Sequence, residues 1–307
     1  MSSHGPVALI IPTLNAASDW PALAGAIKAQ QSAPDQVLIV DSESTDCTVE
    51  LAQSSGFLIT KISRANFNHG GTRQWAVQHV NNAAVIVFLT QDAILASPNS
   101  LQALLRTFDD PLVGAAFGRQ LPRRGANAIE THARLFNYSA NSSVRTFESR
   151  ETLGFKAIFI SNSFAAYRGC ALEAVGGFPD DVILGEDTIT AAHLLMMGWK
   201  IAYAADAEVY HSHAYSWLQE FRRYFDTGVL HSREALLLDQ FGRAGGEGRR
   251  FVVSELAYLW ANDRALIPSA LVRTVLKWSG YRLGRVESRL SAGMKRRLSM
   301  HHGFWEK

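Results

Sequence analysis

The sequence has few cysteines, little net charge and no long apolar run. Its 307 residues contain two cysteines, Cys47 and Cys170, so a disulfide framework is excluded and a reducing compartment is favoured. Neither cysteine has a metal-type partner at short spacing. The formal net charge of +2 is too small to indicate a nucleic-acid partner for the whole molecule.

Targeting signals are missing as well. The N-terminus lacks the basic start, apolar run and small-residue cleavage site of a signal peptide, and no run reaches about 18 apolar residues. We therefore expect a cytoplasmic protein without a spanning helix. With 47% hydrophobic and 19% charged residues, the chain is long enough for one large domain, or for one domain with a smaller helical appendage.

The first part of the chain alternates between two patterns. Short apolar runs cover Val7 to Ile11, Val37 to Val40 and Val85 to Leu89, and helical spacing covers about 18–32, 45–54 and 71–80. This alternation predicts an α/β fold with a mostly parallel central sheet flanked by helices. Ligands of open α/β sheets lie at the carboxyl ends of the strands. That rule places Pro12 to Asn15, Asp41 to Ser44 and Gln91-Asp92 on one rim.

The later part of the chain is less regular. Residues 119–155 are polar and predict a mobile loop or an acceptor-side insertion. Ala157 to Tyr167 favours a strand and Cys170 to Val175 a short helix, followed by a glycine turn at Gly176-Gly177. A helix is expected at Thr188 to Met197, and the sequence after Trp217 is mainly helical.

Two groups of carboxylates carry the candidate chemistry. Glu186 and Asp187 are adjacent acids at the start of a predicted helix, and either could act as a general base. The alternative for this pair is an acidic helix N-terminus stabilised by the helix dipole. Asp92 follows the apolar run that ends at Leu89, a position that suits a metal ligand. Together they predict a site that binds a donor with a phosphate leaving group through a metal on one side, and that deprotonates an acceptor on the other.

Two further segments have a structural and a functional interpretation. Asp41 and Asp46 fit a turn and a helix cap on local chemistry alone. In Phe67 to Arg73, paired glycines permit close approach of the backbone to a ligand, and Arg73 could contact a diphosphate or hold Asp92. The alternative for that segment is a glycine-rich helix start with a surface arginine, and His69 within it could face a sugar or be a loop residue.

Taken in order, these motifs resemble the inverting family-2 glycosyltransferases of the GT-A fold, and within them bacterial rhamnosyltransferases. The resemblance covers about residues 6–230, and the Phe67 to Arg73 stretch is the part most similar to enzymes that use dTDP-L-rhamnose. Its elements are Ile10 to Asn15, Val40 to Asp46, Phe67 to Arg73, Leu89 to Ala93, Gly185 to Asp187 and Tyr210 to His213.

The resemblance implies roles for individual residues. It makes Asp187 the catalytic base, with Glu186 orienting the acceptor or nearby backbone, and Asp41 an acceptor for the nucleotide ring N–H. Inversion at dTDP-β-L-rhamnose would give an α linkage to a lipid-linked cell-surface glycan, as in lipopolysaccharide or O-antigen biosynthesis. The implied donor-binding residues are Pro12, Thr13, Asn15, Asp41, Ser44, His69, Arg73, Gln91, Asp92, Arg222 and Arg223.

The implied metal site departs from the family pattern. Most relatives carry an acid two positions before the metal-binding aspartate, but this chain has Thr90-Gln91-Asp92. The family points to His211 as a second ligand for Mg²⁺ or Mn²⁺, with His213 as the reserve. The alternative is that these histidines form a structural loop, because alternate residues on a strand face opposite sides and do not easily chelate together. Arg222 or Arg223 could reach the phosphates or lie on a solvated helix face.

The C-terminal segment is strongly basic. From Arg264 to Lys307 there are ten Lys or Arg residues against two acids, interleaved with Trp278, Tyr281, Leu283, Val286, Leu290, Met294, Leu298, Phe304 and Trp305. This predicts a basic amphipathic surface at the inner face of the cytoplasmic membrane, or an ordinary helical face packed on its own domain.

The expected organisation is a catalytic domain over 1–225, divided near 118 into nucleotide-sugar and acceptor halves, and a helical region over 226–307. Other classes remain open. A family-2 enzyme could use a UDP- or GDP-linked sugar, and a noncatalytic glycan-binding protein could retain the same residue types. A nucleotidyltransferase should show an early glycine-rich phosphate loop with a basic residue, which Pro12 to Asn15 is not.

Overall fold

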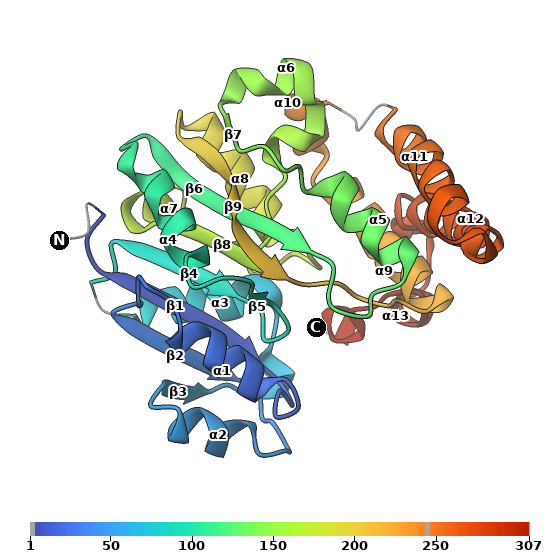
Figure 1. The fold of residues 1–307 in the computed structure, drawn as a ribbon. Helices are drawn as coiled ribbons and strands as arrows, with labels where there is room; N and C mark the ends of the chain where they lie inside the picture. The colour runs from blue at the N-terminus through green and yellow to red at the C-terminus, as the bar shows by residue number, and fades with distance from the viewer. Residues whose placement is uncertain (1–3, 81, 243–245, 307) are drawn as a thin grey trace.

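The computed structural model describes residues 4–80, 82–242 and 246–306, which form an α/β sheet with a helical region at its side (Figure 1). The first half supplies β1 (Val7–Thr13), α1 (Trp20–Lys28), β2 (Gln36–Asp41), α2 (Thr48–Ser54), β3 (Leu58–Lys61), α3 (His69–Gln78), β4 (Val85–Leu89), β5 (Ile94–Leu95) and α4 (Ser100–Leu105). The predicted strands and helices of this half are therefore confirmed; α1 and α2 are shorter than expected, and α3 begins two residues earlier.

The second half begins with β6 (Val113–Leu121), α5 (Ala128–Asn137), β7 (Ser143–Arg145), α6 (Arg150–Leu153), β8 (Phe164–Arg168), α7 (Gly169–Ala174), α8 (Glu186–Met196) and β9 (Lys200–Tyr210). Five helices follow: α9 (Trp217–Arg233), α10 (Ala235–Phe241), α11 (Glu247–Asn262), α12 (Ile267–Gly284) and α13 (Ala292–Leu298). The helices expected at 170–175, at 188–197 and after 217 are confirmed.

Two expectations for the second half are corrected. Residues 119–155 are not a mobile loop, because α5 begins with a capping box in which Asn127 and Glu130 satisfy each other's backbone N–H groups. The strand expected over 157–167 is shorter, because Gly154–Ile158 forms a 3-10 helix and pairing starts only at Phe164.

One sheet organises the molecule, in the order β3-β2-β1-β4-β8-β6-β9-β5, with β7 beside β9. Among the described strands, β1, β2, β3 and β4 pair in parallel, as do β6 and β9. The pairings of β8 with β4 and β6, and of β9 with β5 and β7, are antiparallel. The sheet is therefore mixed, and its parallel part carries the predicted rim.

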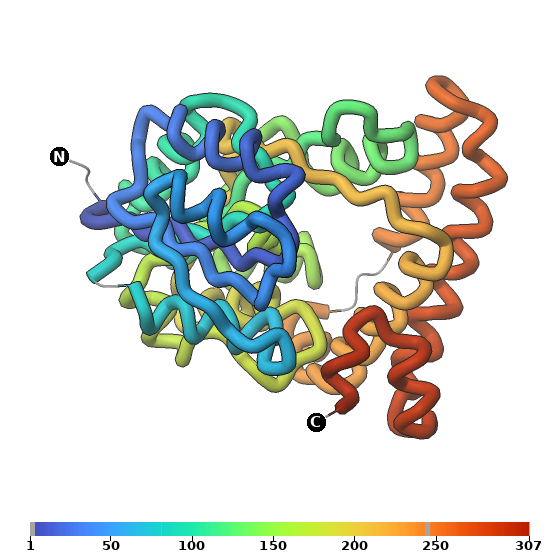
Figure 2. The backbone as a smooth tube through the Cα atoms, turned by 90° about the horizontal axis from the view of Figure 1, so that it is seen from below, coloured from blue at the N-terminus to red at the C-terminus, as the bar shows by residue number. Residues whose placement is uncertain are grey.

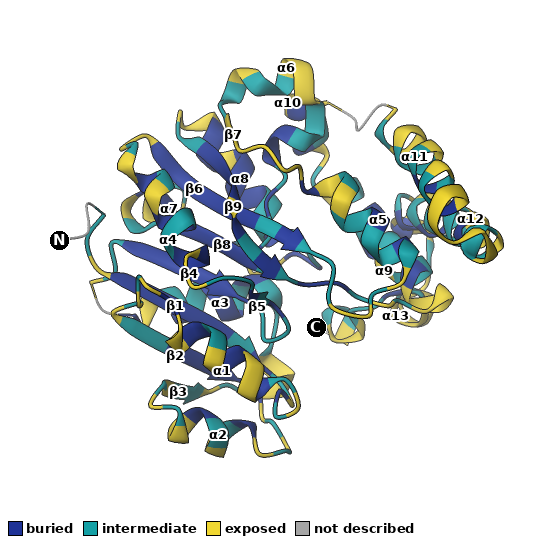
Figure 3. Ribbon diagram, in the orientation of Figure 1, coloured by how far each residue is buried: buried dark blue, intermediate teal, exposed yellow. Residues whose placement is uncertain are grey.

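Helices cover both faces of the sheet, and the strands between them are buried (Figure 3). Alternate residues of β1 point to opposite sides, as a strand requires. Leu9 and Ile11 pack with α1 and α4 on one face, and Ala8 and Ile10 pack with α3, α7 and α8 on the other. This burial on both faces explains why these strands are uninterrupted apolar runs.

The C-terminal helices lie beside the sheet and turn back toward it (Figure 2). The helix α12 packs closely on α9 through Gly228, Gly280 and Gly284, where an added Cβ would meet backbone atoms of the opposite helix at 2.0–2.4 Å. Because α9 runs across residues 225 and 226, we propose that the helical region begins with α9. No helix of the described residues is long and apolar enough to cross a membrane.

Candidate active site

The loops after β1 and β2 form a closed hydrogen-bond network at the predicted rim. Asp41 is fully buried, and its carboxylate accepts hydrogen bonds from Thr13 Oγ1 at 3.1 Å, Ser44 N at 2.9 Å and Ser44 Oγ at 2.5 Å. The carboxylate therefore joins the ends of β1 and β2, and its contact with a nucleotide ring N–H stays a prediction. Asn15, at a φ of 52°, accepts from Thr45 N at 2.8 Å.

Gln91 joins this network to the end of β4. Its side-chain amide makes two hydrogen bonds with the backbone of Leu14, accepting from N at 2.7 Å and donating to O at 3.1 Å. Asp46, one residue before the N-cap position Cys47, accepts from Thr48 N at 3.0 Å and from Ala17 N at 3.1 Å, so it satisfies the first N–H of α2 and ties that helix to the loop after β1. The rim thus brings Pro12, Thr13, Asn15, Asp41, Ser44 and Gln91 together.

The glycines that precede Arg73 approach another part of the chain. Gly70 lies against the turn that follows α7, where an added Cβ would stand 1.7 Å from the carbonyl oxygen of Pro179. Nearby, Asn68 Nδ2 donates to the Asp180 carbonyl at 2.9 Å, and Gln74 Oε1 accepts from Phe178 N at 2.9 Å. The expected close approach to a ligand is corrected, because in this structure the glycine at 70 makes room for the turn leading to the acidic pair.

Arg73 and Glu186 form a buried ion pair that fastens α3 to α8. Arg73 Nη1 lies 2.9 Å from Glu186 Oε1, and both side chains are 6% exposed. Burial alone would raise the pKa of Glu186, but the charges of Arg73 and His69 and the hydrogen bond from Asn162 together lower it. Arg73 therefore holds Glu186 rather than Asp92, and Glu186 orients its surroundings without facing the cavity. His69, at the start of α3, packs its ring against that of His301 at 5.0 Å.

Asp187 is held beside this ion pair and reaches the cavity. Its carboxylate accepts hydrogen bonds from Asn162 N at 3.2 Å and Thr188 N at 2.7 Å. Burial and the negative charge of Glu186 raise the pKa of Asp187 to about 7. A carboxylate with that pKa is suited to taking a proton at neutral pH. The side-chain Nδ2 of Asn162 donates to Glu186 Oε1 at 3.2 Å, so one residue contacts both acids, Asp187 through its backbone and Glu186 through its side chain.

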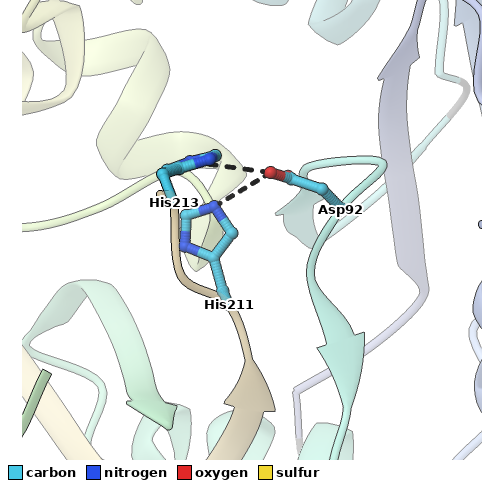
Figure 4. Close-up of side chains that lie close together, drawn as sticks. All are labelled: Asp92, His211 and His213. Atoms are coloured by element: carbon cyan, nitrogen blue, oxygen red, sulfur yellow. Dashed lines mark ion pairs between the residues drawn. The ribbon is translucent and has the colours of Figure 1, made fainter. Parts of the chain in front are cut away.

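Asp92, His211 and His213 converge at the other side of the cavity (Figure 4). Asp92 Oδ2 lies 3.3 Å from His211 Nε2 and 3.6 Å from His213 Nε2. The two histidines reach one carboxylate because β9 ends at Tyr210, so the alternation of a strand no longer applies to them. Burial alone would raise the pKa of Asp92, but His211 and other partners hold it well below its usual range.

The hydrogen bonds of His211 determine which ring nitrogen is free. Its Nδ1 lies 2.9 Å from Gln120 Oε1, and that oxygen also accepts from Arg134, so Nδ1 must be the donor. Nε2 is then the ring nitrogen that faces the Asp92 carboxylate. Burial, with a smaller effect of the neighbouring His211, lowers the pKa of His213 to about 4, so the His213 ring is neutral at pH 7. Three lone-pair donors facing one point fit a divalent cation.

Asp187, His211 and His213 line one cavity of about 650 Å³ between the sheet rim and the C-terminal helices. Arg223 also lines it and lies over the ring of Tyr215 at 5.3 Å, whereas Arg222 is not among its lining residues. The sequence interpretation missed Gln120, Arg134 and Asn162. A capping box before Arg134 was the available signal for the helix α5; Gln120 and Asn162 gave none.

The fold and this cavity define the class of the protein: an α/β protein in which a carboxylate of raised pKa and two histidines of an Asp-His-His cluster line one cavity. Residues 8–176 match the family described as Glycosyl transferase family 2, more than half of the chain. The chain belongs to glycosyl transferase family 2, which confirms the resemblance found in the sequence.

Two curated relatives match nearly the whole chain. It is 47% identical over 300 residues to the O-antigen chain rhamnosyltransferase RfbN of Salmonella typhimurium, covering 97% of this chain and 96% of the relative. It is 45% identical over 298 residues to the O-antigen chain rhamnosyltransferase WbaN of Salmonella anatum, covering 97% and 95%. The family and these identities show a glycosyltransferase.

Solved structures confirm the fold. The mannosyltransferase PcManGT from Pyrobaculum calidifontis, in complex with GDP-Man and Mn²⁺, aligns with a TM-score of 0.62 at 19% identity over 94% of this chain and 90% of that one. TarS of S. aureus, in complex with UDP-GlcNAc, aligns with a TM-score of 0.53 at 13% identity over 93% and 92%. The GT-A expectation is therefore confirmed.

Proposed function

We propose that this enzyme transfers L-rhamnose from dTDP-β-L-rhamnose to a hydroxyl of a lipid-linked O-antigen-type glycan. The observation that carries the proposal is Asp187, a carboxylate of raised pKa in the same cavity as the Asp92, His211 and His213 cluster. The choice of rhamnose is supported by the names of the two relatives and their identity over nearly the whole chain.

The reaction follows from this arrangement as a direct displacement. Asp187 accepts the proton of the acceptor hydroxyl while that oxygen forms a bond to the anomeric carbon. The bond from the anomeric carbon to the diphosphate breaks on the opposite face, so a β-linked donor gives an α-linked product. Glu186 stays ionised beside Arg73 and keeps the pKa of Asp187 high.

A divalent cation, Mg²⁺ or Mn²⁺, would be held by Asp92, His211 and His213. When bound it supplies Lewis-acid neutralisation of the diphosphate leaving group. Arg223 adds a fixed positive charge in the same cavity, whereas Arg222 lies outside its lining. The loops that carry Pro12, Thr13, Asn15, Asp41 and Ser44 offer backbone groups to the nucleoside, and Asp41 keeps their shape.

A donor screen tests this function. Purified protein with Mg²⁺ or Mn²⁺ is incubated with dTDP-L-rhamnose, UDP-sugars and GDP-sugars, and the released nucleoside diphosphate is measured with and without a lipid-linked glycan fraction. The proposal expects release with dTDP-rhamnose well above the others and a further increase with acceptor. Preference for a UDP- or GDP-sugar would show that rhamnose is the wrong donor sugar, although the protein would still act as a family-2 glycosyltransferase. No release with any donor would reject catalysis.

We also propose that the enzyme lies at the inner surface of the cytoplasmic membrane, through the outer face of α11 and α12. The sequence placed this contact on the whole of 264–307, but several apolar side chains of that segment pack inward on Ile183, Phe225 and Val229: Leu283, Leu290, Leu298, Phe304 and Trp305. Lys307 lies outside the described residues. Exposed apolar side chains gather on two helices: Leu271, Val272, Val275 and Trp278 of α12 and Val253 and Trp260 of α11. Val286 and Met294 are also exposed but lie outside these two helices.

The outer face combines these side chains with arginines. Arg264 lies over Trp260 at 4.4 Å and Arg282 over Trp278 at 5.9 Å, which is the composition expected at an anionic lipid surface. Cosedimentation with phosphatidylethanolamine–phosphatidylglycerol vesicles should fall in a W260S/W278S variant and stay unchanged in L236S, whose site is exposed on α10. Equal sedimentation of all three would reject the membrane contact, and loss of a dimer in W260S/W278S would assign the face to a second copy.

A further inference from the structure

The cavity extends away from Asp187 to a wall built by three C-terminal helices. This wall, which we call the helical lobe, joins two aromatic rings to four charged side chains. The charges are two acids and two bases, so the lobe as a whole is neutral at pH 7 if all four are ionised. Its members are Glu220 and Tyr224 of α9, Phe251 and Glu255 of α11, and Arg273 and Lys277 of α12.

The charged groups of the helical lobe are incompletely satisfied by one another. Glu220 Oε1 accepts from Arg273 Nη1 at 3.2 Å, but Lys277 Nζ stays 3.7 Å from the same oxygen. Within hydrogen-bond distance, Nζ finds no acceptor among the described side chains. It lies instead over the rings of Phe251 at 5.1 Å and Tyr224 at 5.7 Å.

Glu255 is the least satisfied member of the lobe. It is 1% exposed, and its Oε1 has no hydrogen-bond partner among the described residues. Burial raises the pKa of Glu255, and the nearby negative charge of Glu220 adds to this effect. Lys277 and Arg273 act in the opposite direction but do not cancel it. A buried carboxylate without partners costs stability, so a group retained in that state calls for a ligand to complete it.

The chemistry that completes this wall is a neutral ring with neighbouring hydroxyl groups. Each hydroxyl can donate to a carboxylate and accept from an ammonium group, which a simple anion or cation cannot do. The aromatic rings offer flat apolar faces to the C–H side of such a ring. A diphosphate would instead meet two carboxylates at close range, and positive charge for it is already present at Arg223 on the rim side of the cavity.

We propose that the helical lobe is the subsite for a pyranose ring of the acceptor glycan, with Glu255 and Lys277 binding its hydroxyl groups. This proposal rests on the proposed function for the identity of the reaction, but the binding of the ring does not depend on which donor is used. The lobe lies in the same cavity as Asp187, so a glycan held there could present a second ring to the base.

Binding of simple glycosides tests the subsite without any turnover. Saturation-transfer NMR with the methyl pyranosides of L-rhamnose, D-galactose and D-mannose is recorded on the full chain and on the E255Q and K277M variants. Loss of one charge-assisted hydrogen bond should weaken the preferred glycoside by about tenfold or more. The matched control is E173Q, the same chemical change at an exposed position of α7. A third variant, F251L, removes the aromatic face with little change in volume.

The outcomes separate the subsite from the reaction. Weaker glycoside binding in E255Q and K277M, with unchanged dTDP-rhamnose hydrolysis and a raised KM for acceptor, supports the proposal. Equal glycoside signals in wild type, E255Q, K277M and F251L overturn it, as does displacement of the glycoside by inorganic phosphate. If no nucleotide sugar is turned over, the proposed function fails, while the glycoside titration still decides the subsite. Thermal unfolding of each variant confirms that the compared proteins are folded.

Discussion

Two regions around the cavity differ in how their polar groups are satisfied. On the rim and at α3, which we call the framework, Asp41, Gln91, Glu186 and Arg73 all bind other parts of the chain. On the cavity side, Asp187 has a raised pKa, His211 and His213 both face Asp92, and Glu255 has an unpartnered oxygen among the described residues. The comparison indicates that the framework fixes the geometry of the site, whereas the cavity side carries the groups that remain able to bind or react. Framework substitutions should therefore reduce stability, and cavity substitutions should reduce turnover.

The largest effect is expected for Asp187→Asn. Removal of the general base should lower kcat by about a thousandfold, within the range found for positioned acids and bases, with donor binding largely kept. Because the change removes a buried charge, the free energy of unfolding should stay the same or rise. Steady-state transfer and urea unfolding measure both quantities, and Asp206→Asn, at an exposed position of β9, is the matched control. Turnover equal to wild type would assign the base elsewhere.

The framework is tested by Arg73→Met. This change leaves Glu186 buried without its partner, and breaking such a pair costs about 3–5 kcal/mol of unfolding free energy. The double variant Arg73→Met with Glu186→Met removes both charges and should recover part of that loss. Denaturant unfolding of the wild type, the single variant and the double variant measures the loss of unfolding free energy and its recovery. A single variant as stable as wild type would show that the pair does not fasten α3 to α8.

Gln120 lies between the two regions and sharpens the boundary. Gln120→Met removes the acceptor that keeps the proton on His211 Nδ1, so we expect Mn²⁺ affinity to fall by about 10–100-fold. Calorimetric titration with Mn²⁺ measures this directly, without donor or turnover. Gln120→Glu restores an acceptor and should recover affinity. Unaltered Mn²⁺ binding in Gln120→Met would show that the Gln120 hydrogen bond to His211 does not contribute to cation affinity.

The pH dependence gives the smallest change. With a pKa of about 7, Asp187 is increasingly protonated as the pH falls, so kcat should drop about tenfold per unit below that value. Glu186→Gln removes a negative neighbour that raises this pKa, so the acid limb should move to lower pH. Parallel pH–rate profiles of wild type and Glu186→Gln test the point, and superimposable profiles would remove Glu186 from the control of the base.

The sequence predicted the parallel part of the fold well because its strands are buried on both faces. It missed β6, whose run Val113–Leu121 is rich in alanine and glycine, and it treated α5 as a loop despite the Asn127 and Glu130 capping pair. Short, small-residue strands and helices with polar starts lack the strong apolar period on which such predictions depend.

The roles of Asp187 and His211 were predicted from the family resemblance and that of Asp92 also from its place after an apolar run, and these roles stay predictions. The structure places Asp187 and His211 on one cavity, with Asp92 beside His211. The partner of Arg73 is 113 positions away, and no local pattern encodes a contact at that separation. The same holds for Gly70, whose need for a small side chain comes from the Pro179 carbonyl.

The separate origins of the two cavity walls have a consequence for how this enzyme can diversify. The base is anchored by α3 and α8, whereas the helical lobe comes from helices that follow the last strand of the sheet. Mutations in the helices that follow the sheet can therefore change acceptor preference without altering the residues around Asp187. To transfer acceptor preference between related enzymes, α11 and α12 should be exchanged together with the face of α9 that they pack on.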